Sequence, residues 1–312
     1  MLFTEFKSIT EFLDFFRDEA ACIKYFEQIR FKNGLFCAHC GHRKVHRFRD
    51  GKRFRCADCK KDFTIKTGTI FGESKVTLRK WFIAIYLLTT SSKGVSSVVL
   101  AKQVGVTQKT AWFIDHRIRQ AMRQNKKKLE GKVEIDETMV GGKEKNKHLV
   151  NRVSDTQGRS TKTKTAVMGF LQRGGGIRAS VVENLTLSTV EQNILDNINF
   201  GTQLYTDTFM SYSKIGRLYP HQSVNHKAGQ YVNGDAHTNS IESFWAIFKR
   251  GYIGTYHLMS KKHLQRYVDE FCYRFNRKGR AIGEVFADAV HKVAVNDTLR
   301  YKALTQPYGQ KA

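Results

Sequence analysis

The chain has 312 residues, of which 41% are hydrophobic, so it is long enough for two or three folded domains. Lys and Arg number 53 against 28 Asp and Glu, which gives a net charge of +25. An excess of this size favours a polyanionic partner, most commonly nucleic acid, over a basic protein without one. The longest apolar run is far shorter than a membrane span and the N-terminal stretch is acidic, so we expect no membrane insertion or export and a cytoplasmic, nucleoid-associated protein.

The N-terminal stretch is predicted to be helical. Phe12, Phe16, Cys22 and Phe26 recur at roughly helical intervals, which indicates an N-terminal helical segment over residues 1–33.

Four of the six cysteines form two closely spaced pairs. Cys37 and Cys40 are separated by two residues, as are Cys56 and Cys59, and fifteen residues lie between the pairs. Two such knuckles form a tetrahedral thiolate site for one structural Zn²⁺, which predicts a zinc ribbon over residues 34–70. So short a segment buries little apolar surface, and the metal supplies the missing stability. The alternatives are unliganded or disulfide-bonded cysteines, or a redox motif, which this double spacing favours less.

Residues 74–128 are predicted to be a helical, DNA-binding region of the helix-turn-helix type. Gly105 suits the sharp turn between two helices, and Thr107 suits the cap of the second. One side of that second helix is apolar, and the other carries Lys109, Trp112, His116, Arg119 and Arg123. We therefore expect Lys109, Arg119 and Arg123 to contact DNA. The alternative is an ordinary helical hairpin with a solvated basic face.

After residue 131 the periodicity changes to that of an α/β domain. Strands are predicted at 132–140, 165–171, 177–184, 202–209 and 221–226, with helices at 187–198, at 209–219 and from 237 onwards. Three strands followed by alternating helices and strands are the element order of an RNase H-like mixed sheet. We therefore predict an RNase H-like catalytic core over residues 131–300, preceded by the zinc ribbon and the helix-turn-helix region.

Three acidic residues in this domain are candidates for catalytic metal ligands. Phosphodiester chemistry on nucleic acid commonly uses two divalent ions held by carboxylates from different elements. Asp136 lies within a predicted strand, Asp207 near the end of another, and Glu242 at the start of the last helix. Glu134 is a rival for Asp136 on the same strand face, whereas Glu137 is expected on the opposite face. Asp207 as a helix cap and Glu242 as a surface acid are the alternatives.

The spacing of these residues resembles a known pattern. Two strand Asp residues, a Glu thirty-five residues after the second and a Lys seven residues further resemble the DDE transposase and integrase arrangement. The segments EIDETMVGGKEKNKH, YTDTFMSY, HTNSIESFWAIFKRGYIGTYH and YVDEFCYRFNRK resemble the IS1595 family of insertion-sequence transposases, in the ISXO2-like group. That family also carries a four-cysteine zinc ribbon, so the resemblance covers about residues 20–290. It implies a DDE-type transposase that cuts element ends with magnesium and joins them to target DNA.

The third catalytic position has two candidates in this chain. Groups of the family carry either Asn or Glu there, and Asn239 and Glu242 lie on one helical stripe. An anionic oxygen holds a divalent ion more strongly than an amide does, which favours Glu242 and leaves Asn239 as a neutral or supporting ligand. Lys249 lies on the same stripe and is expected to contact DNA phosphate.

The basic run Lys143, Lys145 and Lys147 is expected either near DNA or as a solvated turn.

The predicted function is therefore an insertion-sequence transposase with one structural Zn²⁺ and two catalytic Mg²⁺ or Mn²⁺ ions. Its partners would be terminal inverted repeats, target DNA and further copies of the chain in a homo-oligomer. The alternatives are an RNase H-like nuclease without strand transfer and a DNA-binding regulator with an inactive core. The sequence does not specify the repeat sequence, the target preference, the copy or cut route, or the oligomer number.

Overall fold

The computed structural model describes residues 5–125, 127–154, 156, 160–208, 212, 215–225, 232, 234–295 and 299–306. The chain divides into two compact units, Met1–Met122 with Gly279–Ala312, and Arg123–Lys278. Within the part of the chain described, no helix has both the length and the apolar character needed to cross a membrane.

The first unit begins with two helices rather than the single predicted helical stretch. They are α1 (Ile9–Phe15) and α2 (Glu19–Arg30). The helical conformation is interrupted between them, because the side chain of Asp18 accepts a hydrogen bond from the N–H of Ala21 and so begins a new helix, α2. An antiparallel sheet of order β1-β2-β3 follows, with strands β1 (Val45–Arg47), β2 (Arg53–Cys56) and β3 (Asp62–Thr64).

The helix-turn-helix region consists of α3 (Leu78–Thr90), α4 (Ser97–Val104) and α5 (Gln108–Ala121). Gly105 ends α4 with a φ of 67°, a left-handed conformation that glycine adopts without strain. The Thr107 side chain caps α5 by accepting a hydrogen bond from the N–H of Thr110. The predicted turn and cap are therefore confirmed.

The last helices of the chain, α9 (Ile282–Val295) and α10 (Tyr301–Thr305), belong to the first unit. Helix α9 packs on α2, α3 and α5, and its Phe286 ring contacts the rings of Phe12, Phe16 and Phe82. The second unit consequently ends at Lys278 rather than at residue 300 as predicted, because α9 packs into the aromatic core of the first unit.

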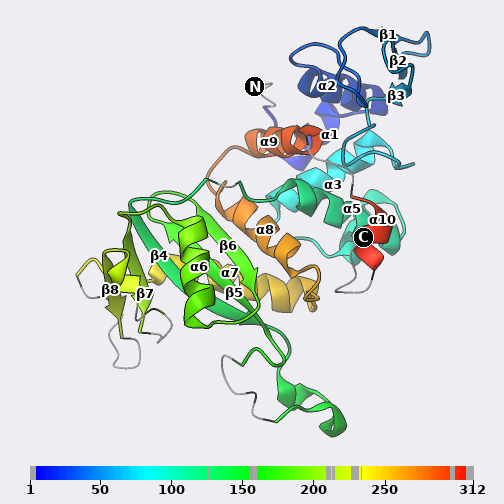
Figure 1. Cartoon of the computed structure of the whole chain (residues 1–312). Coiled ribbons are helices and arrows are strands. Elements are labelled where there is room, and N and C mark those ends of the chain that lie inside the picture. Colours follow the sequence, from blue (N-terminus) through cyan, green and yellow to red (C-terminus); the bar gives the residue numbers. More distant parts are fainter. Residues whose placement is uncertain are drawn as a thin grey trace. The chain divides into compact units, whose positions relative to one another are not determined.

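The second unit is built on a five-stranded mixed sheet of order β6-β5-β4-β7-β8 (Figure 1). Its strands are β4 (Lys132–Val140), β5 (Thr165–Gln172), β6 (Ile177–Val182), β7 (Gln203–Asp207) and β8 (His221–Val224). The first three strands are antiparallel, and β7 and β8 continue parallel to β4. This order and direction define an RNase H-like fold, as predicted.

Helices cover both faces of this sheet. They are α6 (Leu187–Asn197), α7 (Asn239–Gly251) and α8 (Leu264–Phe275), and a π-helical turn at Tyr252–Tyr256 follows α7. Alternate residues of β5 serve the two faces: Val167 and Leu171 pack in the core of α7 and α8, whereas Met168 and Phe170 pack in the core of α6. The predicted helix at 209–219 lies partly outside the described residues, of which Ile215–Arg217 form a 3₁₀ turn.

Candidate metal and DNA sites

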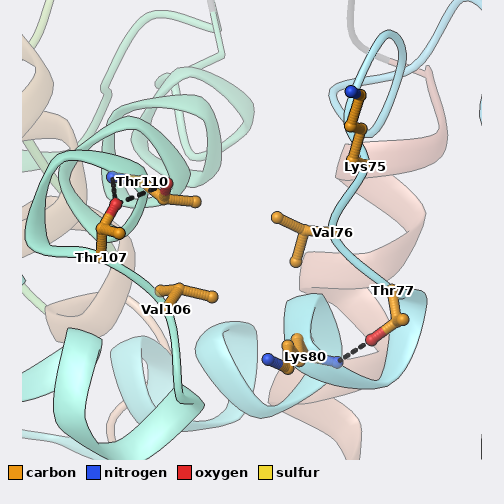
Figure 2. A pocket seen from close by; sticks show the side chains of 7 residues that line it. All are labelled: Lys75, Val76, Thr77, Lys80, Val106, Thr107 and Thr110. Atoms are coloured by element: carbon orange, nitrogen blue, oxygen red, sulfur yellow. Dashed lines mark hydrogen bonds between the residues drawn. The ribbon is translucent and has the colours of Figure 1, made fainter.

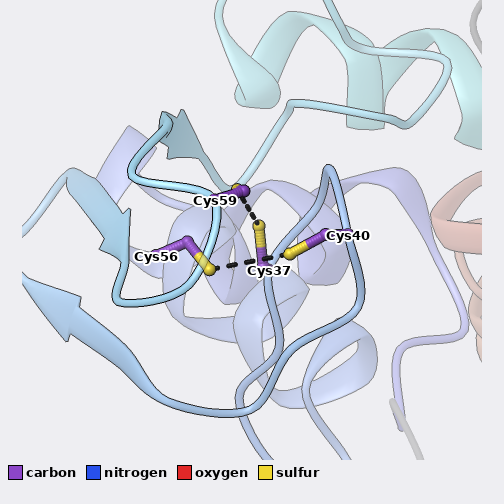
Figure 3. Close-up of side chains that lie close together, drawn as sticks. All are labelled: Cys37, Cys40, Cys56 and Cys59. Atoms are coloured by element: carbon purple, nitrogen blue, oxygen red, sulfur yellow. Dashed lines mark hydrogen bonds between the residues drawn. The ribbon is translucent and has the colours of Figure 1, made fainter.

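The four paired cysteines come together in the first unit (Figure 3). One sulfur atom from each of Cys37, Cys40, Cys56 and Cys59 lies within 4.8 Å of the others, and none of the four forms a disulfide. The Sγ atoms of Cys37 and Cys59 are 3.7 Å apart, and those of Cys40 and Cys56 are 3.6 Å apart. Four sulfurs bound to one zinc at about 2.3 Å would be separated by about 3.8 Å in a tetrahedron. The cluster therefore fits Zn²⁺.

The backbone around these sulfurs favours the thiolate that zinc requires. The N–H groups of His39 and Asp58 donate hydrogen bonds to the sulfurs of Cys37 and Cys56, at 3.3 and 3.4 Å. Burial of Cys37 opposes its ionisation, but hydrogen bonds from the N–H groups of His39 and Cys40 and from the neighbouring thiols lower the pKa of this thiol to about 6. The N–H of His42 favours the thiolate of Cys40, but desolvation and the other three thiols together raise the pKa of Cys40 to about 12, so the cluster ionises at one thiol more readily than at all four.

In the second unit, carboxylates gather where two parallel strands separate. The pairing of β4 with β7 extends only from Lys132 opposite Gln203 to Glu134 opposite Tyr205. Asp136 lies two residues after the last pair, in the middle of β4, and Asp207 is the last residue of β7, so both lie where the two parallel strands separate. Their carboxylate oxygens lie within 4.8 Å of each other. The two strand acids predicted from the sequence are thus brought together.

Glu137 is the member of this cluster that the sequence placed elsewhere. It follows Asp136 on β4 and was expected on the other face, yet one of its carboxylate oxygens lies within 4.8 Å of those of Asp136 and Asp207. Asp136 and Glu137 extend from opposite faces of β4. Their carboxylates can approach each other here because the pairing of β4 with β7 has already ended. The buried hydroxyl of Tyr212 donates a hydrogen bond to Glu137 at 2.7 Å. The only feature of the sequence that could have indicated its membership is that Glu137 is an acid directly beside Asp136.

The crowded carboxylates change the ionisation of Asp136. Its burial, followed by the negative charges of Glu137, Asp207 and Glu242, raises the pKa of this carboxyl from 3.8 to about 8. Glu242 thus lies near enough to act on Asp136 through its charge. Acids gathered so closely that their charges repel one another are the donor set expected for a hard divalent cation.

Glu242 is held in position by its neighbours at the start of α7. The hydroxyl of Thr238 donates a hydrogen bond to its carboxylate at 2.8 Å. Thr238 does not cap the helix. Instead the carboxylate of Glu134, on β4, accepts hydrogen bonds from the N–H groups of Ser240 and Ile241 at 3.0 and 3.1 Å. A strand residue therefore caps the helix that carries Glu242.

Glu134 is itself paired, which explains why a fully buried carboxylate is tolerated there. Arg173 donates from Nε to Glu134 at 2.8 Å and from its other nitrogens to the carbonyls of Asp235 and His237. Its guanidinium also lies 4.1 Å from the ring centre of Tyr205. Glu134 thus fastens α7 to the sheet two residues before Asp136, and it is not a competing ligand at the strand's edge.

A glycine opposite Asp136 allows α7 to approach the sheet. Gly169 pairs with Asp136 across β4 and β5, and a Cβ atom at this position would lie 2.6 Å from the indole of Trp245 and 3.0 Å from Ile241. Any larger residue would push α7 outward. The close approach keeps Glu242 near the two strand acids.

The remaining candidates on α7 lie on its accessible side. Asn239, Glu242 and Lys249 are all exposed, whereas Phe244 and Trp245 are buried against the sheet. Asn239 and Lys249 therefore stand on the same accessible surface as Glu242, as their shared stripe predicted.

The predicted basic DNA contacts divide into exposed and buried residues. Lys109, Arg123, Lys143 and Lys145 are exposed, and Lys147 forms an ion pair with Glu144 at 2.6 Å. Arg119 does not fit the prediction: its side chain is 1% exposed and lies 3.9 Å from the carboxylate of Asp115, one turn earlier on α5. Helix α5 packs against α3, α4 and α9. The face that was expected to be basic and accessible is therefore exposed at Lys109 and buried at Arg119.

A cavity of about 320 Å³ lies beside the helix-turn-helix turn (Figure 2). Val106 and Thr107 line it from the turn, and Lys75 and Thr77 from the start of α3. The ammonium group of Lys80, also in the lining, donates to the carbonyl of Gly105 at 2.7 Å. Neither Lys109 nor Arg119 lines the cavity, so it is separate from the predicted DNA contacts.

Carboxylates gathered where two parallel strands of an RNase H-like sheet separate define a class of proteins with a candidate divalent-metal site at that place. Within that class, residues 128–276 match the model of the ISXO2-like transposase domain, and residues 17–62 match the transposase zinc-ribbon domain. The chain belongs to the ISXO2-like transposase family of IS1595 elements, which confirms the resemblance in the sequence.

Relatives of this family are found in distant organisms. A protein in transposable element ISH50 of Halobacterium salinarum is 31% identical over 280 residues, covering 85% of this chain and 94% of that protein. A transposase-like protein of Haemophilus influenzae is 29% identical over 97 residues, covering 31% of this chain and 77% of its own length.

Two solved structures resemble the chain loosely, each at 11% identity. One is a chain in the simian T-cell lymphotropic virus intasome with PP2A regulatory subunit B56 gamma, with a TM-score of 0.31 over 73% of this chain and 76% of that chain. The other is in the Mos1 strand transfer complex, with a TM-score of 0.29 over 68% and 74%. The assignment of the fold rests on the strand order and the family.

Proposed function

We propose that this transposase hydrolyses the phosphodiester bond at each end of an insertion sequence and joins the freed 3′-OH to target DNA. The observation that carries the proposal is the convergence of Asp136 and Asp207 where β4 and β7 separate, with the charge of Glu242 acting on Asp136. The family supports DNA as the substrate, and so does the net charge of +25.

Asp136, Asp207 and Glu242 would hold a pair of Mg²⁺ or Mn²⁺ ions, with Glu137 within reach of the same position. When bound, such a pair lowers the pKa of water and stabilises charge on the leaving oxygen. Lys249 and Asn239, on the same accessible side of α7, would contact the phosphate beside the scissile bond. No covalent protein–DNA intermediate is needed, since water and then the 3′-OH are the nucleophiles.

The first unit would recognise the element ends. Its zinc ribbon and its helix-turn-helix region with the exposed Lys109 would supply basic surface for DNA, to which the exposed Lys143 and Lys145 of the second unit would add. Joining two ends in one event requires both to be held together, so we expect a homo-oligomer on DNA.

The test is an assay of purified protein with Mg²⁺ and a duplex that spans one element end and its flank. Wild type should release a 3′-OH at the end and transfer that strand into a second DNA, whereas Asp136→Asn and Asp207→Asn should lose both products. Cleavage without transfer would favour a nuclease. DNA binding with neither product would favour a regulator with an inactive core.

The same assay separates the two candidates for the third ligand. We expect Glu242→Gln to abolish cleavage and Asn239→Ala to reduce it about 10- to 100-fold, as a residue that orients a ligand does. The reverse order of effects would assign the metal to Asn239.

A further inference from the structure

The connection between β4 and β5 has an exposed apolar tip. We call its described residues, 141–154, 156 and 160–164, the arm, and Figure 1 shows the part at 141–154 extending away from the sheet. At its tip, a 3₁₀ turn at Leu149–Asn151 leaves Leu149 78% and Val150 92% exposed. Two adjacent aliphatic side chains so exposed are not explained by the folding of this unit, because neither contributes to its cores.

Polar contacts hold the tip in a defined conformation. The guanidinium of Arg152 donates to the carbonyls of Lys147 and Lys145, at 3.0 and 2.7 Å. The carboxylate of Glu144 accepts from the N–H of Val153 at 3.1 Å and pairs with Lys147. These contacts close the chain around the tip, so its apolar side chains are presented outward by the fold.

The surface around the tip is basic. Lys143, Lys145, His148 and Arg152 are exposed there. Among the arm residues that the structure describes, Glu144 is the only acid, and its carboxylate is engaged within the arm. An apolar tip surrounded by cations matches a ligand that combines a polyanionic surface with apolar interior faces.

We propose that the tip of the arm inserts Leu149 and Val150 between base pairs of bound DNA, while Lys143 and Lys145 contact the phosphates on either side. DNA has both required features, since apolar side chains wedge between base steps and unstack them. A second copy of a chain with a net charge of +25 would instead meet electrostatic repulsion at this basic surface. The inference rests on the proposed function only in taking DNA as the substrate.

The test uses the full chain carrying Asp136→Asn, which binds DNA without cutting it, and element-end duplexes with 2-aminopurine at successive positions. Insertion should raise the fluorescence at one base step. Leu149→Ser with Val150→Ser should abolish that rise and weaken DNA binding about tenfold, the effect of losing the burial of about one aliphatic side chain. Leu149→Met with Val150→Ile, which keeps an apolar tip, should retain both.

The lysines provide a second, separable measurement. Lys143→Gln with Lys145→Gln should lower the dependence of binding on salt and leave the fluorescence rise in place at saturation. The proposal is overturned if the Ser variant keeps the rise and the affinity, or if it alters only the oligomeric state of the DNA-free protein, which would assign the tip to a second copy. Failure of the parent chain to bind any end duplex would instead refute the proposed function.

Discussion

The two ligand clusters, one in each unit, are built on opposite principles. The four cysteines lie within 23 consecutive residues, and hydrogen bonds to sulfur favour the thiolate that zinc binds. The acids of the second unit come from β4, β7 and α7, and burial together with the charges of its neighbours raises the pKa of Asp136. We therefore expect the first cluster to need its metal in order to fold, and the second to need its fold in order to bind a metal.

Removal of zinc should have the largest effect, and it should be local. Structural zinc contributes about 10 kcal/mol or more to such small segments, so chelation or Cys56→Ser should unfold the ribbon. Hydrogen exchange should show protection lost over residues 45–64 and retained in β5. Cys22→Ala, which changes a buried cysteine outside the cluster, should leave the zinc content unchanged. Protection that survives the loss of zinc would contradict a metal-dependent ribbon.

The second largest effect should follow from the loss of Glu134, whose buried carboxylate caps α7. Glu134→Gln leaves Arg173 without its charged partner, so we expect a loss of about 3 kcal/mol in the free energy of unfolding. Cleavage should fall about 10- to 100-fold at saturating DNA, because α7 no longer holds Glu242 in place. Both quantities can be measured by denaturant titration and single-turnover kinetics.

The matched control for this change is Lys132→Gln. Lys132 forms an ion pair with Asp235 at 2.7 Å, but both side chains are more than half exposed, so its loss should have little effect. Equal effects of the two substitutions would mean that Glu134 has no special role in positioning α7.

Removing one carboxylate from the acidic cluster should have a smaller effect on the free energy of unfolding, and it should be an increase rather than a loss. Because its pKa rises to about 8, the Asp136 carboxyl must take up a proton when the metal-free protein folds at neutral pH. Asp136→Asn removes that cost, so the variant should gain about 1 kcal/mol of stability while losing activity. Millimolar Mg²⁺ should raise the melting temperature of wild type more than that of the variant. Glu130→Gln, at an exposed position, removes one charge elsewhere and should do neither. A variant less stable than wild type would show that Asp136 is already compensated without metal.

The sequence predicted those features whose causes are local. The cysteine spacing, Gly105 and Thr107 act within a few residues of themselves, and alternation along each strand gave the element order of the sheet. The acids of the second site were candidates because of their predicted strands and helix, and their spacing, which resembles that of a family, indicated that they meet. The cap by Glu134 escaped prediction, because its partners lie more than one hundred residues away and no local pattern records that contact.

The burial of Arg119 also escaped prediction, because it depends on the packing of α5 against other helices, of which α9 comes from a remote part of the chain. Lys109 and Arg119, which lie on the same helix and were both predicted to contact DNA, should therefore differ in their roles. Lys109→Gln should weaken DNA binding about two- to threefold and lower the salt dependence by about one charge, because Lys109 is exposed.

Arg119→Gln should leave the salt dependence of DNA binding unchanged and reduce stability instead, because its guanidinium is buried beside Asp115. Binding of both variants to an end duplex, measured at several salt concentrations, separates the two roles. If Arg119→Gln lowered the salt dependence as Lys109→Gln does, this arginine would have to leave the protein interior when DNA binds. Helix α5 would then contact DNA along its length rather than only at its first turn.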